Sequence, residues 1–297
     1  MNLRDLEYLV AVDQVKHFRK AAEKCHVSQP TLSGQLKKLE EHLGVQLMER
    51  TSRSVVFTSA GKIIAAKAKA ILGQCREMEA LAQSFSDPMR ASVRLGIIPT
   101  LAPYLIPLVM PPLKKAFPEL DLQLYEVRTQ VLTDMLLEDE LDLGLLALPI
   151  EIEALEEVFL FDEPFLLAVS TEHELAAEEP FSYASLGERE VLLLEDGHCL
   201  RGQALDLCLR HGAREAERYK ATSLETLRQM VVSGGGLTLI PKLAVPRGET
   251  VEKIIYRPFE EPAPCRSIGF LYRKTSSRLA CFAKLGTLFR QVVEPHL

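Results

Sequence analysis

The sequence has 297 residues, of which 47% are hydrophobic and 6% are aromatic, with no tryptophan. This length suffices for two or three domains, each with a core of its own. No apolar run reaches the roughly 18 residues that a membrane span requires, and the N-terminus lacks the basic and then apolar layout of a signal peptide. We therefore expect a cytoplasmic protein without a membrane segment.

Charge is shared unevenly along the chain, whose net charge is −6. In positions 1–62, ten Lys/Arg residues outweigh seven Asp/Glu residues, so this part carries +3 and the remainder carries −9. A basic head on an acidic body is expected of a nucleic-acid-binding domain joined to another domain. Six cysteines are scattered over the chain, which is not typical of a disulfide scaffold.

Three helices are predicted in the first 44 residues. The first has apolar residues at helical spacing, namely Leu3, Leu6, Leu9 and Val10. The second covers about 18–25. Ser28 can cap the third helix, Pro30 suits its first turn, and Gly44 suits its end.

The third predicted helix has an apolar face and a polar face. The apolar stripe consists of Leu32, Leu36, Leu39 and Leu43. Small polar and basic residues on the outer side are candidate DNA contacts: Gln29, Pro30, Thr31, Ser33 and Lys37. Such a helix after a tight turn predicts a helix-turn-helix, whose small outer side chains let it enter the major groove. A surface helix in a bundle would also fit this segment.

The following segment predicts a short hairpin and then a long helix. A basic turn holds Arg50 and Arg53 and precedes the β-type run 55–57. A hairpin beside a helix-turn-helix is a wing, which can place Arg53 in the minor groove or on the DNA backbone. The helix, from Ser59 to about Phe85, keeps an apolar stripe that needs a partner, in a second chain or in its own body.

The segment FRKAAEKCHVSQPTLSGQLKKLEEHLGVQLMERTSRSVVFTSAG, residues 18–61, resembles the DNA-binding domain of the LysR-type transcriptional regulators. The resemblance implies an N-terminal all-α winged helix-turn-helix, a long linker helix that pairs two chains, and a C-terminal α/β two-lobed effector domain similar to periplasmic binding proteins. It divides the chain into 1–58 (DNA-binding domain), 59–88 (linker and dimerisation helix) and 89–297 (regulatory domain, with lobe I about 89–161 and 268–297 and lobe II about 162–267).

The body alternates predicted strands and helices. Strands at 92–98 and 120–127 flank a helix, and 128–148 adds a helix and a strand. The run FDEPFLLAVS opens a second unit, and RSIGFLYRK returns to the first. This alternation favours an α/β domain with a mostly parallel sheet. The sequence has no GxGxxG, Walker lysine loop or HExxH, which argues against an enzyme.

The segment LEDGHCLRGQALDLC, residues 194–208, holds two cysteines nine positions apart. A buried strand precedes it, and the residues after Cys199 predict a helix that ends at Gly212. Cys199 therefore lies at or just before the first helical turn, where the helix dipole and unpaired N–H groups favour a thiolate. His198 and Arg201 are expected to add positive or hydrogen-bonding partners.

Cys208 would lie about 13–14 Å from Cys199 along such a helix, on its opposite face. A disulfide requires Cα atoms within roughly 7 Å, so the helix must unwind before the two thiols can be joined. Three interpretations are open from the residues alone: two unrelated structural cysteines, a redox pair, or a metal site built from His198, Cys199, Cys208 and His211. The spacing matches no usual zinc site.

The segments LEDGHCLR, ATSLETLRQMV and LFDEPFLLA resemble the hydrogen-peroxide sensors of the LysR family. The resemblance implies that Cys199 is the peroxide-reactive thiolate, oxidised to sulfenic acid, and that Cys208 is the resolving thiol. It also implies a peroxide pocket formed by Thr100, Thr129, His198 and Arg266, with Arg266 supporting the thiolate. The alternatives are helix capping for the threonines and an ordinary turn residue for His198.

Two residues depart from the pattern of such sensors. Gly202 stands where the best-known members have an acidic residue, and glycine weakens a helix by about 1 kcal/mol relative to alanine. Cys265, beside Arg266, is an additional thiol that could form a competing disulfide. Cys25, Cys75 and Cys281 lie in helical patterns and are expected in the core or in interfaces.

These features together predict a transcriptional regulator, not an enzyme, that senses hydrogen peroxide through a reversible Cys199–Cys208 disulfide and controls antioxidant genes. The resemblance implies promoter DNA, RNA polymerase and a glutaredoxin-type reductant as partners, and a homotetramer built as a dimer of dimers, with no cofactor or metal. One alternative is a LysR-type regulator that senses a small organic ligand and needs no thiol. The other is a thiol peroxidase, which would turn over many equivalents of peroxide.

Overall fold

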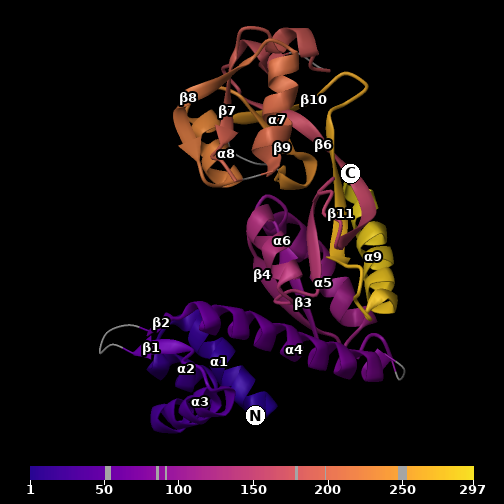
Figure 1. The fold of residues 1–297 in the computed structure, drawn as a ribbon. Coiled ribbons are helices and arrows are strands. Elements are labelled where there is room, and N and C mark those ends of the chain that lie inside the picture. Colours follow the sequence, from indigo (N-terminus) through magenta and orange to yellow (C-terminus); the bar gives the residue numbers. More distant parts are fainter. Residues whose placement is uncertain (51–54, 85–86, 91, 178–179, 198, 247–252) are drawn as a thin grey trace. The chain divides into compact units, whose positions relative to one another are not determined.

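The computed structural model describes residues 1–297 except 51–54, 85–86, 91, 178–179, 198 and 247–252 (Figure 1). The chain forms two compact units, Met1–Phe85 and Ser86–Leu297, called here the head and the body. Within the described residues, no helix combines the length and the apolar character needed to cross a bilayer.

The head is a winged helix-turn-helix followed by a long helix. Its elements are α1 (Leu3–Val15), α2 (Phe18–Lys24), α3 (Gln29–Leu43), β1 (Met48–Arg50), β2 (Val55–Phe57) and α4 (Ser59–Ser84). Ser28 caps α3 by accepting the N–H of Thr31, and Gly44 ends it in the left-handed region at φ 65°. β1 and β2 pair antiparallel and form the wing. This fold confirms the expected helices and hairpin.

The apolar stripe of α3 forms part of the core of the head. Leu32, Leu36 and Leu39 are buried with residues of α1 and of the wing. Gly61 allows α4 to lie directly on the segment before the wing, because a Cβ atom at this position would stand 1.8 Å from the carbonyl oxygen of Leu47. The backbone of α4 at Gly61 therefore packs directly on the backbone at Leu47.

The body is built on a seven-stranded sheet with the order β10-β6-β11-β5-β3-β4, to which β9 adds by pairing with β6. The strands are β3 (Ser92–Ile97), β4 (Asp121–Glu126), β5 (Leu143–Leu148), β6 (Leu155–Ser170), β9 (Thr238–Pro241), β10 (Ile254–Pro258) and β11 (Cys265–Arg273). Lobe I contains β3, β4, β5, β11 and the first half of β6. The second half of β6 belongs to lobe II, with β9 and β10, so this one long strand joins the two lobes (Figure 1).

The expectation of a mostly parallel sheet is wrong. β3 pairs parallel with β4 and β5, but β11 pairs antiparallel with β5 and β6, and β6 pairs antiparallel with β9 and β10. The reason is the connection between the lobes, since β6 leaves lobe I and β11 returns to it in the opposite direction. The return of β11 to the first unit was expected and is confirmed.

Helices cover the sheet of lobe I, namely α5 (Ala102–Ala116), α6 (Thr129–Leu137) and α9 (Leu279–Val293). Leu132 of α6 packs against the sheet where Gly96 of β3 and Gly144 of β5 are register partners. A Cβ atom would lie 2.5 Å from the Leu132 side chain on Gly144 and 3.1 Å from it on Gly96, so the two glycines allow α6 to approach closely.

Lobe II adds the parallel pair β7 (Glu190–Leu194) and β8 (Arg214–Ala221) and the helices α7 (Cys199–Arg210) and α8 (Leu224–Val232). Four short 3₁₀ helices, Glu174–Ala177, Tyr183–Leu186, Lys242–Ala244 and Glu294–His296, lie in connections and at the C-terminus. The helix α7 confirms the helix expected after Cys199.

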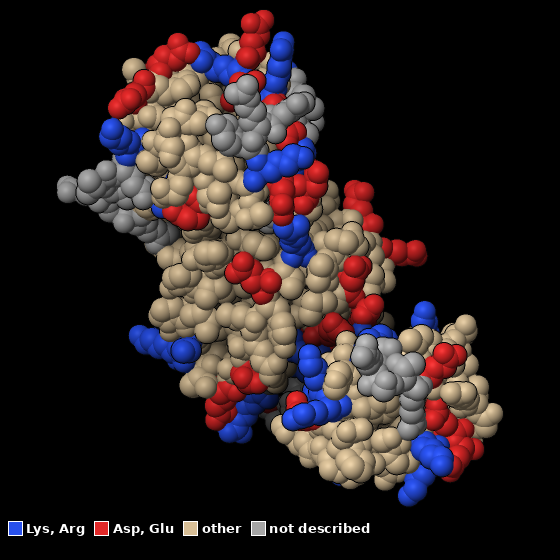
Figure 2. Space-filling view, turned by 90° about the vertical axis from the view of Figure 1, so that its left-hand side faces the viewer, with Lys and Arg blue, Asp and Glu red and all other residues tan. Residues whose placement is uncertain are grey.

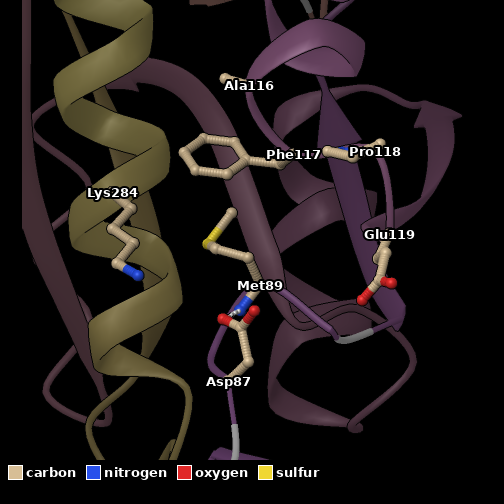
Figure 3. Close-up of a pocket in the computed structure, with 7 residues that line it drawn as sticks. All are labelled: Asp87, Met89, Ala116, Phe117, Pro118, Glu119 and Lys284. Atoms are coloured by element: carbon tan, nitrogen blue, oxygen red, sulfur yellow. Dashed lines mark hydrogen bonds between the residues drawn. The ribbon is translucent and has the colours of Figure 1, made fainter.

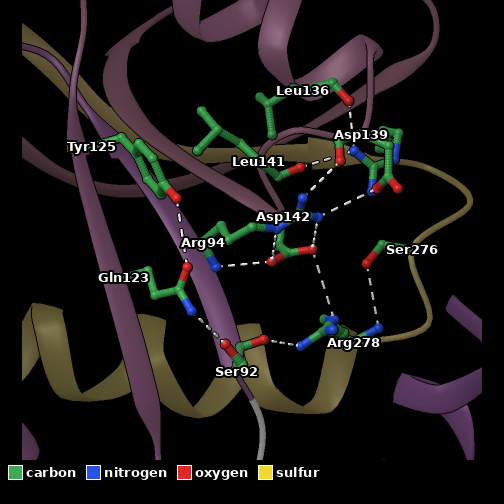
Figure 4. Close-up of polar contacts among 11 residues, drawn as sticks. Ser92, Arg94, Gln123, Tyr125, Leu136, Asp139, Leu141, Asp142, Ser276 and Arg278 are labelled. Atoms are coloured by element: carbon green, nitrogen blue, oxygen red, sulfur yellow. Dashed lines mark hydrogen bonds and ion pairs between the residues drawn. The ribbon is translucent and has the colours of Figure 1, made fainter. Parts of the chain in front are cut away.

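An ion network around the buried Asp142 joins three parts of lobe I (Figure 4). Arg94 of β3 donates to both carboxylate oxygens of Asp142, at 3.0 and 2.8 Å, and Arg273 of β11 pairs with Asp139. Burial opposes the charge of Asp142, but the hydrogen bonds and charge of Arg94, with the charge of Arg278, outweigh it and hold the pKa of Asp142 below its ordinary value. The network ties the turn between α6 and β5 to β3 and β11.

Candidate functional site

Cys199 is the first residue of α7, so its backbone lies where helical N–H groups lack intrahelical partners. Although α7 belongs to lobe II, the half-buried Cys199 packs against the apolar cluster of lobe I, as Val127 does. The thiol of Cys199 is free. The sequence motif therefore places its cysteine at the boundary between the two lobes.

The expected helix between the two cysteines of the motif is confirmed, since α7 is continuous from Cys199 to Arg210. At 1.5 Å per residue, the Cα atoms of Cys199 and Cys208 are about 13–14 Å apart, well beyond the reach of a disulfide. The side chain of Cys208 lies outside the described residues, and so does all of His198. Joining the two sulfurs requires α7 to unwind.

Arg266 is fully buried and forms a polar cluster with residues of three elements. Its guanidinium donates to Oγ1 and the carbonyl oxygen of Thr100, at 2.9 and 3.1 Å, and to Oε2 of Glu163 at 2.8 Å. The other oxygen of Glu163 accepts the N–H of Leu243 at 2.9 Å. Thr100 does not cap a helix, because α5 begins at Ala102 and has no side-chain cap. The structure thus brings together Thr100 and Arg266, as the resemblance implied.

Thr129 is the first residue of α6, the helix that follows β4. Its Oγ1 atom is buried and, within the described part of the chain, has no hydrogen-bond partner. Buried hydroxyls nearly always have a partner, so an unpaired one is a candidate contact for a small polar ligand. The capping alternative for Thr129 is also wrong, since α6 shows no side-chain cap.

Arg201 does not supply free positive charge to the cysteine. Its Nη2 atom donates to both carboxylate oxygens of Glu215, at 2.9 and 2.7 Å, and its Nε lies 3.3 Å from Asp196. Two carboxylates therefore compensate its charge. Arg201 instead connects the first turn of α7 to β8 and to the preceding loop.

Three other thiols, those of Cys25, Cys265 and Cys281, are poorly suited to react with peroxide, because only a thiolate attacks it. Burial raises the pKa of Cys25, Cys265 and Cys281, in the last case to about 11. The negative charge of Glu7 raises the pKa of Cys25 further, and that of Asp162 raises the pKa of Cys265. The competing role considered for Cys265 is therefore disfavoured at neutral pH.

Replacing Gly202 by alanine is expected to make the disulfide easier to reduce. A Cβ atom at Gly202 would meet nothing within 4 Å, so the alanine should stabilise α7 by about 1 kcal/mol. Since a Cys199–Cys208 disulfide would require α7 to unwind, the thiol–disulfide equilibrium should shift toward the thiols about fivefold, and the reduction potential should rise by about 20 mV. Equilibration with glutathione redox buffers, followed by mass mapping, measures this shift.

The matched control for this experiment is Gly34→Ala, at a helical glycine of the head that is equally open. It should leave the potential unchanged. An unchanged or lower potential in Gly202→Ala would mean that α7 does not unwind when the disulfide forms.

A pocket of about 280 Å³ lies elsewhere in lobe I (Figure 3). It is lined by Asp87, Met89, Ala116, Phe117, Pro118, Glu119 and Lys284. Met89 precedes β3, whereas Thr100 follows the other end of the same strand. The pocket therefore lies at the end of β3 opposite to the Arg266 cluster and is separate from the cysteine site.

The predicted DNA contacts lie on the outer side of α3. Gln29, Pro30, Thr31 and Lys37 are exposed, and Ser33 is half-buried. The Thr31 hydroxyl also contacts that of Ser28 at 2.7 Å, and Lys37 lies 3.9 Å from Glu41. Arg53 and the side chain of Arg50 fall outside the described residues. Figure 2 shows acidic and basic side chains mixed over the face of the molecule that it draws. The assignment of DNA contacts depends on the position of α3 in the helix-turn-helix.

Sequence reasoning missed Glu163, Arg128 and Glu195. Glu163 is the buried counter-ion of Arg266, and Arg128 of lobe I pairs with Glu195 in the loop before α7. The sequence contains only a weak signal for these pairs, because 103 residues separate Glu163 from Arg266 and 67 separate Arg128 from Glu195.

A winged helix-turn-helix joined to a two-lobed α/β body defines a DNA-binding regulator with a sensory domain. Comparison with known families supports this class for both the head and the body. Residues 3–62 match the bacterial regulatory helix-turn-helix protein, lysR family, and residues 86–294 match the LysR substrate binding domain.

Individual relatives narrow the class further. The chain is 46% identical over 296 residues to the DNA-binding transcriptional dual regulator OxyR of Escherichia coli K12, covering all of this chain and 97% of that one. Full-length OxyR from Pseudomonas aeruginosa, with a cysteine replaced by aspartate, superimposes with a TM-score of 0.78 at 36% identity, over 98% of this chain and 95% of that one. A peroxide-bound cysteine mutant of Corynebacterium glutamicum OxyR superimposes with a TM-score of 0.70 at 33% identity, over 99% of this chain and 93% of that one. The chain belongs to the OxyR-type hydrogen-peroxide sensors of the LysR family.

Proposed function

We propose that this protein is a transcriptional regulator that senses hydrogen peroxide by forming a disulfide between Cys199 and Cys208, and thereby controls antioxidant genes. One observation carries the proposal: Cys199 begins a continuous helix at the boundary of the lobes, and Cys208 lies on that same helix beyond bonding distance. Oxidation must therefore change the fold of the body. A covalent bond that cannot form without refolding is suited to act as a switch.

The chemistry needs two sulfur atoms and one peroxide. The Cys199 thiolate attacks one peroxide oxygen, the O–O bond breaks, and hydroxide leaves and is protonated to water, so that Cys199 becomes a sulfenic acid. The Cys208 thiolate then attacks this sulfur, the S–O bond breaks and a second water leaves. Peroxide accepts the two electrons that the sulfurs lose. A dithiol reductant of the glutaredoxin type reverses the change by thiol–disulfide exchange.

Four residues are proposed to hold peroxide and to favour the thiolate: Thr100, Thr129, His198 and Arg266. Within the described part of the chain Oγ1 of Thr129 has no hydrogen-bond partner, which supports this assignment, since this hydroxyl can bond to a peroxide oxygen without breaking a contact seen there. Arg266 supports it in a different way, because it fixes the orientation of the Thr100 hydroxyl. These residues would bind peroxide and position it beside the thiolate, whereas the electrons that reduce peroxide come from the two sulfur atoms alone.

The proposal includes the DNA and protein partners. The outer residues of α3, with Arg50 and Arg53 of the wing, would contact promoter DNA. Exposed Ile63, Ile71 and Met78 on α4 support pairing with a second chain in a homotetramer. The division at 58 and 88, contact with RNA polymerase and a cytoplasmic location belong to the same proposal. If phosphate contacts anchor the head, DNA affinity will fall steeply with added salt.

Mass mapping of the thiols in the full-length protein tests the proposal. After sub-stoichiometric peroxide, a Cys199–Cys208 disulfide should appear first, with about one peroxide consumed per disulfide. A first disulfide through Cys265 would contradict the assigned pair. Consumption of many equivalents would instead favour a thiol peroxidase, and induction that persists after alkylation of the cysteines would favour a regulator that senses an organic ligand.

A further inference from the structure

Segments of the two lobes meet directly beside Cys199. The segment 127–129 follows β4 of lobe I and leads into α6, and the loop 195–197 follows β7 of lobe II and leads into α7. Val127 and Cys199 pack against the same apolar cluster. The position of Cys199 therefore depends on how the loop 195–197 is held against lobe I.

Arg128 makes that contact. Its Nη2 atom donates to the carboxylate of Glu195, and its Nη1 atom lies 3.5 Å from the carbonyl oxygen of Asp196. Gly197, at φ 93°, lies under the same side chain, because a Cβ atom there would stand 3.4 Å from Nη1 and 3.6 Å from Cδ of Arg128. One arginine thus covers three consecutive residues of the loop.

The far side of the loop is bound to α7 itself. Nε of Arg201 lies 3.3 Å from the carboxylate of Asp196, and Nη2 of Arg201 bonds to Glu215 of β8. The loop is therefore held between lobe I, through Arg128, and the first turn of α7, through Arg201. Moving Cys199 away from lobe I must break the first of these contacts.

We propose that Arg128 is a positioning residue that clasps the loop 195–197 to lobe I, keeps Cys199 in its reactive place, and opposes its movement toward Cys208. This inference rests on the proposed function of the two cysteines. It implies that Arg128 acts on the two chemical steps in opposite directions: the clasp favours attack on peroxide and slows closure of the disulfide.

Arg128→Met should separate the two steps. Trapping of the sulfenic acid in a Cys208→Ser background should show slower attack on peroxide. Disulfide closure, measured with Cys208 present, should be faster. Because the two side chains of the ion pair are 43% and 31% exposed, each effect should be about two- to fivefold. A residue that merely stabilises the fold would not change the two rates in opposite directions.

Two further variants identify the partner. Glu195→Gln should reproduce both changes, and the double variant should be no worse than either single one, because both remove the same contact. Arg90→Met is the matched control, since Arg90 and Glu119 form an exposed ion pair of lobe I far along the chain from the cysteines. It should leave both rates unchanged. Raising the salt concentration should move the wild type toward the Arg128→Met rates.

The outcomes separate this inference from the function on which it rests. If Arg128→Met attacks peroxide and closes a normal Cys199–Cys208 disulfide at wild-type rates, the positioning role of Arg128 is wrong and the proposed function is unaffected. Additive effects of Arg128→Met and Glu195→Gln would overturn the pairing of these two residues. A wild-type protein that forms no Cys199–Cys208 disulfide would overturn the proposed function itself.

Discussion

Cys199→Ser is expected to bind promoter DNA as the wild type does and to lose its peroxide response completely. Serine keeps the size of the side chain, but its hydroxyl is not ionised at neutral pH and does not attack peroxide. The change lies in α7 of the body, whereas the residues proposed to contact DNA lie in the head. Fluorescence anisotropy with labelled promoter DNA, with and without peroxide, measures both properties.

Cys265→Ser is the control for this variant, because Cys265 is an exposed thiol whose pKa is raised by burial of the sulfur and by the charge of Asp162. It should keep a normal response. A peroxide response that survives in Cys199→Ser would exclude Cys199 as the reacting group.

Arg266→Met should lower the free energy of unfolding of the body by about 3–5 kcal/mol, the usual cost of breaking a buried ion pair. Both side chains of the pair, Arg266 and Glu163, are completely buried. Methionine fills part of the space but leaves the Glu163 carboxylate, among the described residues, with the N–H of Leu243 as its hydrogen-bond donor, and it frees the Thr100 hydroxyl from Arg266. Denaturant unfolding of the full-length protein measures the loss.

The double variant Arg266→Met/Glu163→Gln tests the cause. Removing the second charge should restore part of the lost stability, because the cost of Arg266→Met comes mainly from an unpaired buried carboxylate. If the double variant is as unstable as the single one or worse, packing of the arginine, and not its charge, stabilises this part of the body.

Most local elements of this protein follow from the sequence by itself. Ser28, Pro30 and Gly44 delimit α3. Of the predicted leucine stripe, Leu32, Leu36 and Leu39 are buried and Leu43 is half-buried. The helix after Cys199 is likewise correct, and with it the separation of the two cysteines. These features depend on residues within a few positions of one another, where caps, turn residues and the helical period act directly.

The tertiary structure alone decided which distant residues meet. The return of β11 to lobe I was predicted, but its antiparallel pairing was not. The burial of Arg266 against Glu163 and the contact of Arg128 with Glu195 were not predicted either. In the local sequence, each of these residues is an ordinary charged residue, and β11 is an ordinary strand. No periodicity or motif indicates which distant residue or strand it will contact. Such pairs form because the tertiary fold brings together segments 67 or 103 residues apart. For Arg266 and Glu163, whose side chains are completely buried, opposite charges are then required, because a buried charge is costly unless it is paired.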